Sequence, residues 1–277
     1  MLVPMLSRTD LDGLSAIVRA AADEELLGRF DRVVASKKRD GSLITEADLA
    51  MQRRVQAALK ERWPEFELLG EEMPAEEQAR LLQARGAGLW CLDPLDGTSN
   101  FAAGIPFFSV SLALIVDGVV QVGLVLDPAS RECFAALRGQ GAWLNGQSLQ
   151  TADTTERLGD AMAMVDLKRL PAELVQVLAA QAPYRSQRSF GSVALDWCWL
   201  ASGRCQVYLH GGQKLWDYAA GTLILAESGA VGGLLQRYDG DWLGELTLTP
   251  RIAVAATSAP LLGQWRGWID RALAPSS

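Results

Sequence analysis

Apolar residues in the first part of the chain recur every three or four positions, which is the period of an amphipathic helix. This pattern predicts a helix over residues 10–30. A second helix is predicted over 46–62, because Thr45 and Asp48 form a capping-box pattern at its start and Pro64 follows its end. Each helix should place one apolar face against a core.

The pattern then changes to short apolar runs separated by turn residues. The predicted strands lie at 109–117, 119–127, 132–138 and 141–144. Asp117-Gly118 joins the first two runs, and Asn145-Gly146 follows the last one. Both dipeptides favour the tight turns of antiparallel hairpins, so this region should form an antiparallel sheet.

From residue 151 onward, short strand-like runs alternate with helical patterns, which is typical of layered α/β proteins. The predicted strands lie at 160–166, 184–187, 204–209, 231–236 and 251–255. The predicted helices lie at 171–181, 191–203, 215–228 and 259–273. The change of pattern divides the chain into an α+β half, 1–150, and an α/β half, 151–277, and we expect the two halves to form one compact unit.

Composition narrows the class of protein. The chain has 277 residues, and 49% of them are hydrophobic, which is enough for a large core. No uncharged apolar run approaches the roughly 20 residues that span a bilayer, and no signal-peptide pattern is visible, so we expect a cytoplasmic protein without a membrane partner. The net charge of −7 argues against broad nucleic-acid binding, although Lys37-Lys38-Arg39 is a local basic cluster.

The cysteines are predicted to be structural. They lie in apolar stretches and form no CxxC pair, which favours reduced, buried thiols over a zinc site or a disulfide. The four are Cys91, Cys133, Cys198 and Cys205.

The candidate chemistry centres on residues 93–101, which read Asp-Pro-Leu-Asp-Gly-Thr-Ser-Asn-Phe. The preceding apolar run predicts a buried strand that ends at Asp93. The proline favours an extended conformation at Asp93, and Gly97 permits a tight turn. Asp93 and Asp96 can then face one point, and with the Leu95 carbonyl they supply the hard oxygen ligands that Mg²⁺ prefers.

Further acids stand elsewhere at the ends of predicted elements. Glu71-Glu72 ends a strand-like run, and Asp217 lies in the first turn of a predicted helix. Each acid also has an ordinary interpretation: a solvated loop for Glu71-Glu72, a helix cap for Asp217 and Asp48, and a simple turn for Asp96. These interpretations do not explain why Asp93, Asp96 and Asp217 all stand at strand ends or helix starts within apolar sequence, so we favour a shared site.

Three motifs together resemble the inositol monophosphatase family. The chain has Gly-Glu-Glu at 70–72, the Asp-Pro-Leu-Asp-Gly-Thr-Ser-Asn-Phe segment, and Trp-Asp-Tyr-Ala-Ala-Gly at 216–221. Upstream, Thr45 and Asp48 are similar to the family's Thr-x-x-Asp element. The resemblance extends over about 42–229, and it implies an alternating α-β-α-β-α sandwich of the inositol monophosphatase and fructose-1,6-bisphosphatase type.

The resemblance implies hydrolysis of a small phosphate monoester, assisted by two or three Mg²⁺ ions that activate a water molecule. The implied metal ligands are Glu71, Asp93, the Leu95 carbonyl, Asp96 and Asp217. The implied catalytic residues, which would position the water, are Thr98, Glu71 and Asp48. The implied substrate-binding residues are Asp96, Gly97, Thr98, Gly191, Ser192, Val193, His210 and Asp217.

The substrate stays open between several phosphate esters. The Thr-Ser-Asn-Phe ending of the motif favours inositol 1-phosphate over 3′-phosphoadenosine 5′-phosphate or fructose 1,6-bisphosphate. His210, however, stands where inositol phosphatases usually have a glutamate that hydrogen-bonds substrate hydroxyls. His210 either lines the pocket or ends a strand as a surface residue, and Asp196 is either a substrate-side residue or an exposed helix acid.

The alternative of another class is a binding or regulatory protein that keeps the fold without turnover. The intact set of carboxylates disfavours it. The resemblance also implies inhibition by Li⁺ and assembly as a homodimer. We therefore expect a small phosphorylated substrate and a second copy of the chain as partners, and no nucleic acid.

Overall fold

The structure is a computed structural model that describes residues 6–30, 35–37, 43–84, 88–152 and 155–274. Lys38 and Arg39 of the basic cluster, and Ser42 at the start of the family resemblance, lie outside the described residues.

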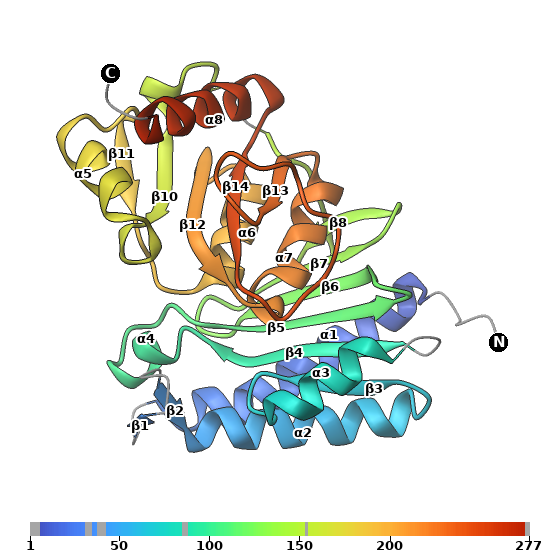
Figure 1. The fold of residues 1–277 in the computed structure, drawn as a ribbon. Coiled ribbons are helices and arrows are strands. Elements are labelled where there is room, and N and C mark those ends of the chain that lie inside the picture. Colours follow the sequence, from blue (N-terminus) through green and yellow to red (C-terminus); the bar gives the residue numbers. More distant parts are fainter. Residues whose placement is uncertain (1–5, 31–34, 38–42, 85–87, 153–154, 275–277) are drawn as a thin grey trace.

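Helices and sheets alternate in five layers (Figure 1). The outer helices α1 (Arg8–Ala22) and α2 (Glu46–Arg62) cover one face of a seven-stranded sheet. The helices α6 (Val193–Ala201) and α7 (Leu215–Ser228) lie between this sheet and a five-stranded one. A last layer, α5 (Ala172–Ala180) and α8 (Ala259–Leu273), covers the second sheet. The predicted α-β-α-β-α sandwich is therefore confirmed.

The first sheet is antiparallel except at one edge, where its first two strands run parallel. Its strands, in sheet order, are β3 (Glu67–Gly70), β4 (Leu89–Asp96), β5 (Ser109–Val116), β6 (Val119–Asp127), β7 (Glu132–Leu137), β8 (Gly141–Leu144) and β9 (Gln147–Leu149). Asp117 and Gly118 both have positive φ, at 51° and 76°, and Asn145-Gly146 shows the same pattern. These are the backbone angles that a two-residue hairpin turn requires, so both predicted turns are confirmed.

The second sheet brings three parallel strand ends to one edge. Its order is β11 (Ser186–Arg188), β10 (Met162–Asp166), β12 (Val207–Gln213), β14 (Arg251–Ala256) and β13 (Val231–Leu235). Because β10 runs parallel to both β11 and β12, the carboxyl ends of the three strands meet at the same edge, where ligands commonly bind in α/β sheets.

The predicted helices differ from the structure mainly at the N-terminus. The helix predicted over 10–30 ends at Ala22, and one π-helical segment, Asp23–Leu27, follows it. Sequence analysis did not predict α3 (Ala75–Gln83) or the short strands β1 (Ala35–Lys37) and β2 (Leu43–Thr45). The two strands have three residues each, which is too few positions for a hydrophobic period to appear.

One core cluster joins both halves of the chain. Leu69 and Cys91 of the first sheet and Tyr208 of the second belong to the same buried cluster as residues of α6 and α7. Two glycines permit this packing: a Cβ at Gly221 would lie 2.5 Å from the side chain of Trp197, and one at Gly123 would lie 2.6 Å from a backbone oxygen of α7. This shared core supports our proposal that the halves form one compact unit.

All four cysteines are free and buried, as predicted. Within the described part of the chain, the helices all lack the length and apolar character that crossing a bilayer demands.

Candidate active site

Two buried carboxylates stand at the end of β4. The strand was predicted to stop at Asp93, but it continues to Asp96, with an irregularity in its pairing to β5 between these two residues. Asp93 accepts a hydrogen bond from the backbone N–H of Leu95 at 3.0 Å. In a regular strand, residues three positions apart point to opposite faces. The irregularity lets the side chains of Asp93 and Asp96 point to the same side of β4.

Gly97 turns the chain from this strand into the short helix α4 (Thr98–Ala102). Its φ is 93°, which favours glycine, and a Cβ there would lie 3.2 Å from the carbonyl oxygens of Gly191 and Phe107. Gly97 is therefore required both by the turn and by the close approach of the second half of the chain.

The Thr98 hydroxyl lies beside the same turn. It donates to the Leu95 carbonyl at 3.0 Å and lies 3.4 Å from a carboxylate oxygen of Asp48. Asp48 also accepts from the backbone N–H and the hydroxyl of Thr45 at 2.7 and 2.6 Å, which completes the predicted capping box of α2. The ordinary interpretation of Asp48 as a cap partner is thus confirmed, and the same side chain also reaches Thr98.

Asp217 enters the site from α7. It lies in the first turn of the helix and accepts from the backbone N–H of Lys214 at 2.8 Å. The buried hydroxyl of Ser111, on β5, donates to the carbonyl of Trp216 at 2.8 Å. This bond ties the start of α7 to the first sheet and so fixes where Asp217 lies.

Asp96 is held by the segment that begins α6. The Ser192 hydroxyl donates to it at 2.6 Å, and the backbone N–H groups of Val193 and Ala194 donate at 3.2 and 2.8 Å. The Ser109 hydroxyl adds a contact at 3.3 Å. The predicted substrate-side residues Ser192 and Val193 are thus brought to Asp96.

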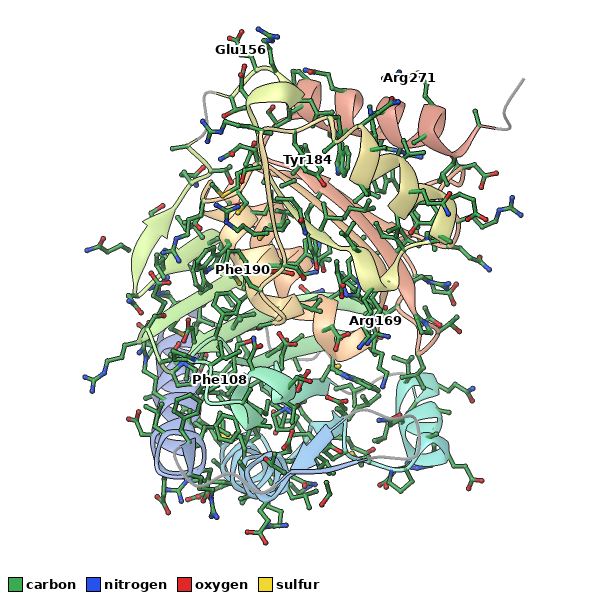
Figure 2. The ribbon with its side chains drawn as sticks, turned by 90° about the vertical axis from the view of Figure 1, so that its left-hand side faces the viewer. Phe108, Glu156, Arg169, Tyr184, Phe190 and Arg271 are labelled. Carbon is green, nitrogen blue, oxygen red and sulfur yellow. The ribbon has the colours of Figure 1, made fainter. Side chains whose placement is uncertain are left out.

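Gly191, the third of these residues, is held by Asn100. The Asn100 side-chain amide donates to the carbonyls of Phe107 and Phe190, at 2.7 and 2.6 Å. The rings of Phe107 and Phe190 stack with centroids 5.0 Å apart. Figure 2 shows Phe190 at mid-height of the molecule and Phe108 below it, on the side of the N-terminal helices.

Glu71 follows β3 on the neighbouring strand end. Its backbone N–H donates to the carbonyl of Leu92 at 3.1 Å. The buried side chain of Gln78, on α3, donates to the carbonyls of Gly70 and Glu71 at 2.8 and 3.1 Å. Gln78 was not singled out in the sequence, because a glutamine in an acidic stretch gives no signal of its tertiary contact.

Asp93, Asp96 and Asp217, which we call the carboxylate cluster, are electrostatically strained. Burial raises the pKa of Asp93 well above its usual value, and the charges of Glu71, Asp96 and Asp217 raise it further. Burial, followed by the charges of Asp96 and Glu71, likewise raises the pKa of Asp217. Burial also raises the pKa of Asp96, against the lowering effect of the Ser192 bond. Opposite charge would relieve all three.

The donor set fits a hard divalent cation, because it consists of oxygen atoms only and its carboxylates repel one another. Among the described residues, however, no three acid, histidine or cysteine side chains meet as metal ligands do. The reason is visible in the hydrogen bonds: Asp93, Asp96 and Asp217 are each turned toward donors of the protein.

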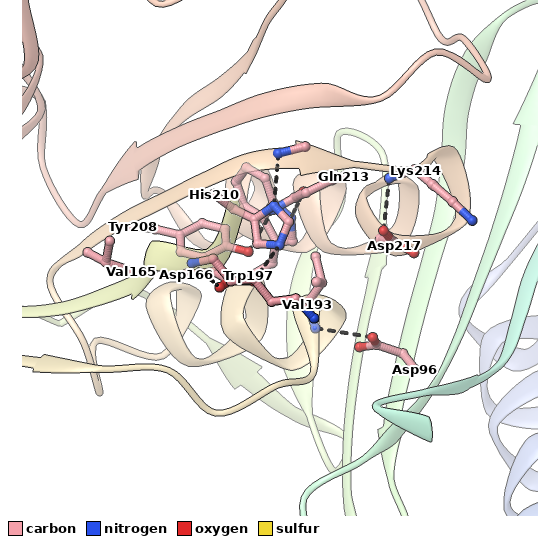
Figure 3. A network of polar contacts seen from close by, with 12 residues as sticks. Asp96, Val165, Asp166, Val193, Trp197, Tyr208, His210, Gln213, Lys214 and Asp217 are labelled. Atoms are coloured by element: carbon pink, nitrogen blue, oxygen red, sulfur yellow. Dashed lines mark hydrogen bonds and ion pairs between the residues drawn. The ribbon is translucent and has the colours of Figure 1, made fainter. Parts of the chain in front are cut away.

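His210 is buried in β12 rather than exposed at a strand end. Its Nε2 lies 3.3 Å from a carboxylate oxygen of Asp166, at the end of β10, and its Nδ1 accepts from the backbone N–H of Gly212 at 3.2 Å (Figure 3). The surface interpretation of His210 is therefore wrong. The predicted hydrogen bond to a substrate also meets an obstacle, since both ring nitrogens already have protein partners.

Asp196 is also buried, so the interpretation as an exposed helix acid is wrong. Burial raises its pKa well above the usual value, the charges of Asp96 and Asp166 add to this, and a hydrogen bond from Tyr208 opposes it. The Tyr208 hydroxyl in turn accepts from Gln213 at 2.6 Å, and Gln213 accepts from the Trp197 indole at 2.9 Å. These buried polar groups connect α6 to β12.

Comparisons with known proteins agree with the motifs. The sequence pattern of the inositol monophosphatase family matches residues 10–269. A Pasteurella multocida protein named Nus factor SuhB is 33% identical over 233 residues, covering 82% of this chain and 83% of that protein. The extragenic suppressor protein SuhB of Bartonella henselae has a similar structure, with a TM-score of 0.77, 26% identity and coverage of 97% and 100%. The fold is also similar to an IMPase/NADP phosphatase complexed with Mg²⁺ and phosphate, with a TM-score of 0.80, 24% identity and coverage of 97% of each chain.

Proposed function

We propose that this chain, which belongs to the inositol monophosphatase family, is a Mg²⁺-dependent phosphatase that hydrolyses a small phosphate monoester, with inositol 1-phosphate as its preferred substrate. The observation that carries the proposal is the carboxylate cluster. The buried Asp93 and Asp96 and the half-buried Asp217, from a distant part of the chain, all have raised pKa values beside Glu71, an arrangement that costs stability unless a cation is bound.

The proposed ligands of Mg²⁺ are Glu71, Asp93, the Leu95 carbonyl, Asp96 and Asp217. Bound there, Mg²⁺ would supply positive charge that stabilises the transferring phosphoryl group and makes a water molecule a better nucleophile. A protein of similar fold that was solved with Mg²⁺ and phosphate supports the dependence on a divalent ion.

The chain's own residues would orient the water and the phosphate. The Thr98 hydroxyl lies 3.4 Å from a carboxylate oxygen of Asp48 and can hydrogen-bond a water molecule beside it. The carboxylates of Asp48 and Glu71 can accept a proton from that water. The backbone N–H groups of Gly97 and Thr98, at the start of α4, would face the phosphate oxygens. Roles of this kind need the rigid support that Asp48 has from its bonds to Thr45.

A second candidate function is regulatory. It is favoured by one observation: a relative that is 33% identical carries the name Nus factor SuhB. The prediction that this chain binds no nucleic acid therefore stays a prediction.

The experiment is a phosphate-release panel on the purified chain. Inositol 1-phosphate, 3′-phosphoadenosine 5′-phosphate and fructose 1,6-bisphosphate are compared with Mg²⁺, with EDTA, and with Mg²⁺ plus Li⁺. We expect Mg²⁺-dependent release that is fastest from inositol 1-phosphate and is lowered by Li⁺. Release from none of the esters would overturn the phosphatase proposal and favour the regulatory function, whereas insensitivity to Li⁺ would remove only the Li⁺ expectation.

We also propose a homodimer. Ile105 is 48% exposed beside the half-buried rings of Phe107 and Phe190, which gives this region apolar surface for a partner. A mass in solution that stays monomeric across micromolar concentrations would contradict this proposal.

A further inference from the structure

Asp166 and His210 form a pair at the carboxyl ends of two parallel strands. They are direct register partners in β10 and β12, so their side chains emerge on the same side of the sheet. The His210 side chain is 4% exposed, whereas that of Asp166 is 29% exposed. Of the two, only Asp166 offers polar surface to a ligand.

The hydrogen bonds show which atoms of His210 and Asp166 donate and which accept. Because Nδ1 of His210 accepts from Gly212, the ring proton is on Nε2, which donates to Asp166. The other Asp166 oxygen accepts from the backbone N–H of Lys168 at 3.1 Å. Each carboxylate oxygen can accept a further hydrogen bond, so Asp166 keeps acceptor capacity toward solvent.

The backbone around the pair is rigid. A Cβ on Gly211, the residue after His210, would overlap the carbonyl of Arg169 at 1.8 Å. The turn Leu167–Arg169 that follows Asp166 is therefore packed directly on the strand that carries His210. Figure 2 shows Arg169 at the level where the upper and lower halves of the molecule meet.

The pair also lies near the carboxylate cluster. Figure 3 shows Val193 between the pair and Asp96 in that view, and the Val193 N–H donates to Asp96 at 3.2 Å. The charges of Asp96 and Asp166 both raise the pKa of the buried Asp196. A phosphate ester bound at the cluster can thus extend its alcohol portion along Val193 toward Asp166.

We propose that Asp166 selects the leaving group by accepting a hydrogen bond from one of its hydroxyls, and that His210 acts as a positioning residue that holds Asp166 in place. This inference rests on the proposed phosphatase function and assigns the residue that distinguishes inositol 1-phosphate from esters of alcohols without further hydroxyls. A carboxylate is a strong acceptor for hydroxyl groups, and loss of such a contact discriminates between substrates more than loss of an apolar one.

The test compares two substrates of the same ring size, inositol 1-phosphate and cyclohexyl phosphate, which lacks hydroxyls. For Asp166→Ala we expect kcat/KM for inositol 1-phosphate to fall by roughly ten- to a hundred-fold, and kcat/KM for cyclohexyl phosphate to change by less than about two-fold. His210→Gln should change the ratio in the same direction but less. Asp160→Ala is the matched control, because Asp160 is an exposed acid near the other end of β10.

Equal losses on both substrates, or no change on either, would overturn the inference. If Asp166→Ala does not fold, judged by its thermal melt, Asp166→Leu has nearly the size of the native side chain and no acceptor oxygen, and it is held to the same ratio. Failure of the proposed function gives a different result, because the wild-type chain would then release phosphate from neither ester.

Discussion

The carboxylate cluster and the Asp166–His210 pair lie near each other, yet they differ in the charges that they bring together. Asp93 and Asp217 each accept from a backbone N–H two or three residues away, and Asp96 accepts from hydroxyls and N–H groups of other elements. The pair joins two strands through a side-chain contact between residues 44 positions apart (210 minus 166). The cluster is destabilised by like charges, whereas the pair is complementary.

This difference shows in the pKa values. Burial and like charges raise the pKa of Asp93 and Asp217, while the hydrogen bond from His210 lowers the pKa of Asp166. When burial and like charges raise the pKa of an acid, a bound cation can stabilise its ionised form. An acid whose partner is already present does not need a cation, and its remaining acceptor capacity suits a neutral hydroxyl.

The largest effect should come from Asp93→Asn. The substitution keeps the size of the side chain and its acceptor for Leu95, but it removes the central charge of the cluster. We expect phosphate release to fall by at least roughly a hundred- to a thousand-fold, with Mg²⁺ activation weakened, because several kcal/mol of charge stabilisation depend on the bound ion. Thermal stability without metal should not fall. Near-normal, Mg²⁺-dependent turnover would show that the cluster is not the catalytic site.

The sequence and the structure lead to different expectations for His210→Glu. The sequence suggests that a glutamate here would improve use of inositol phosphate. In the structure, the new carboxylate would be buried against Asp166 and would lose the Gly212 hydrogen bond. We expect unfolding free energy to drop by about 1–3 kcal/mol, measured by urea denaturation. An unchanged midpoint together with improved turnover of inositol 1-phosphate would contradict the buried placement of this residue.

A smaller effect should appear in the pH dependence of stability. Because the pKa of Asp93 and of Asp217 is raised in the folded state, folding retains protons that the unfolded chain releases above about 3.8. Stability from these groups is therefore present below that pH and is lost as the pH rises toward their folded pKa values. Asp166 has the opposite sign: its lowered pKa stabilises the fold above about 3.8, and this contribution is lost on acidification.

Mg²⁺ should offset the loss at high pH. At a concentration ten times its Kd, the ion stabilises the fold by about 1.4 kcal/mol, and it competes less with protons at pH 8 than at pH 5. Melting curves at both pH values, with and without Mg²⁺, measure the difference. Asp93→Asn serves as the control, and an equal Mg²⁺ effect on the variant would place the ion elsewhere.

Much of the fold was predictable because its signals are local. The limits of α2, α7 and α8 follow from caps and apolar periods, and the two hairpin turns follow from their dipeptides. The carboxylate cluster was predictable as a set because each acid stands at the end of an element in a motif. What the sequence could not show were contacts set by tertiary packing, such as Gln78 against the Glu71 backbone and Ser111 against α7.

The burial of His210 and Asp196 could not be predicted for the same reason. Each is a polar residue in a segment whose apolar period is weak, and only the neighbouring strand or helix supplies its partner. Likewise, the extension of β4 to Asp96 depends on pairing with β5, since Asp96 pairs with Ser109 beyond the irregularity. Sequence analysis ended the strand where its apolar run ends.

The position of α7 between the two sheets has a consequence for synthesis of the chain on the ribosome. The strands of the first sheet are all translated before residue 150, but the helix that covers their inner face ends only at Ser228. Until then, a growing chain has Asp93 and Asp96 without Asp217, and the apolar face of a seven-stranded sheet without its cover. The first half of this protein therefore exposes apolar surface while residues 150–228 are translated, and its site is completed by one of the last helices to emerge.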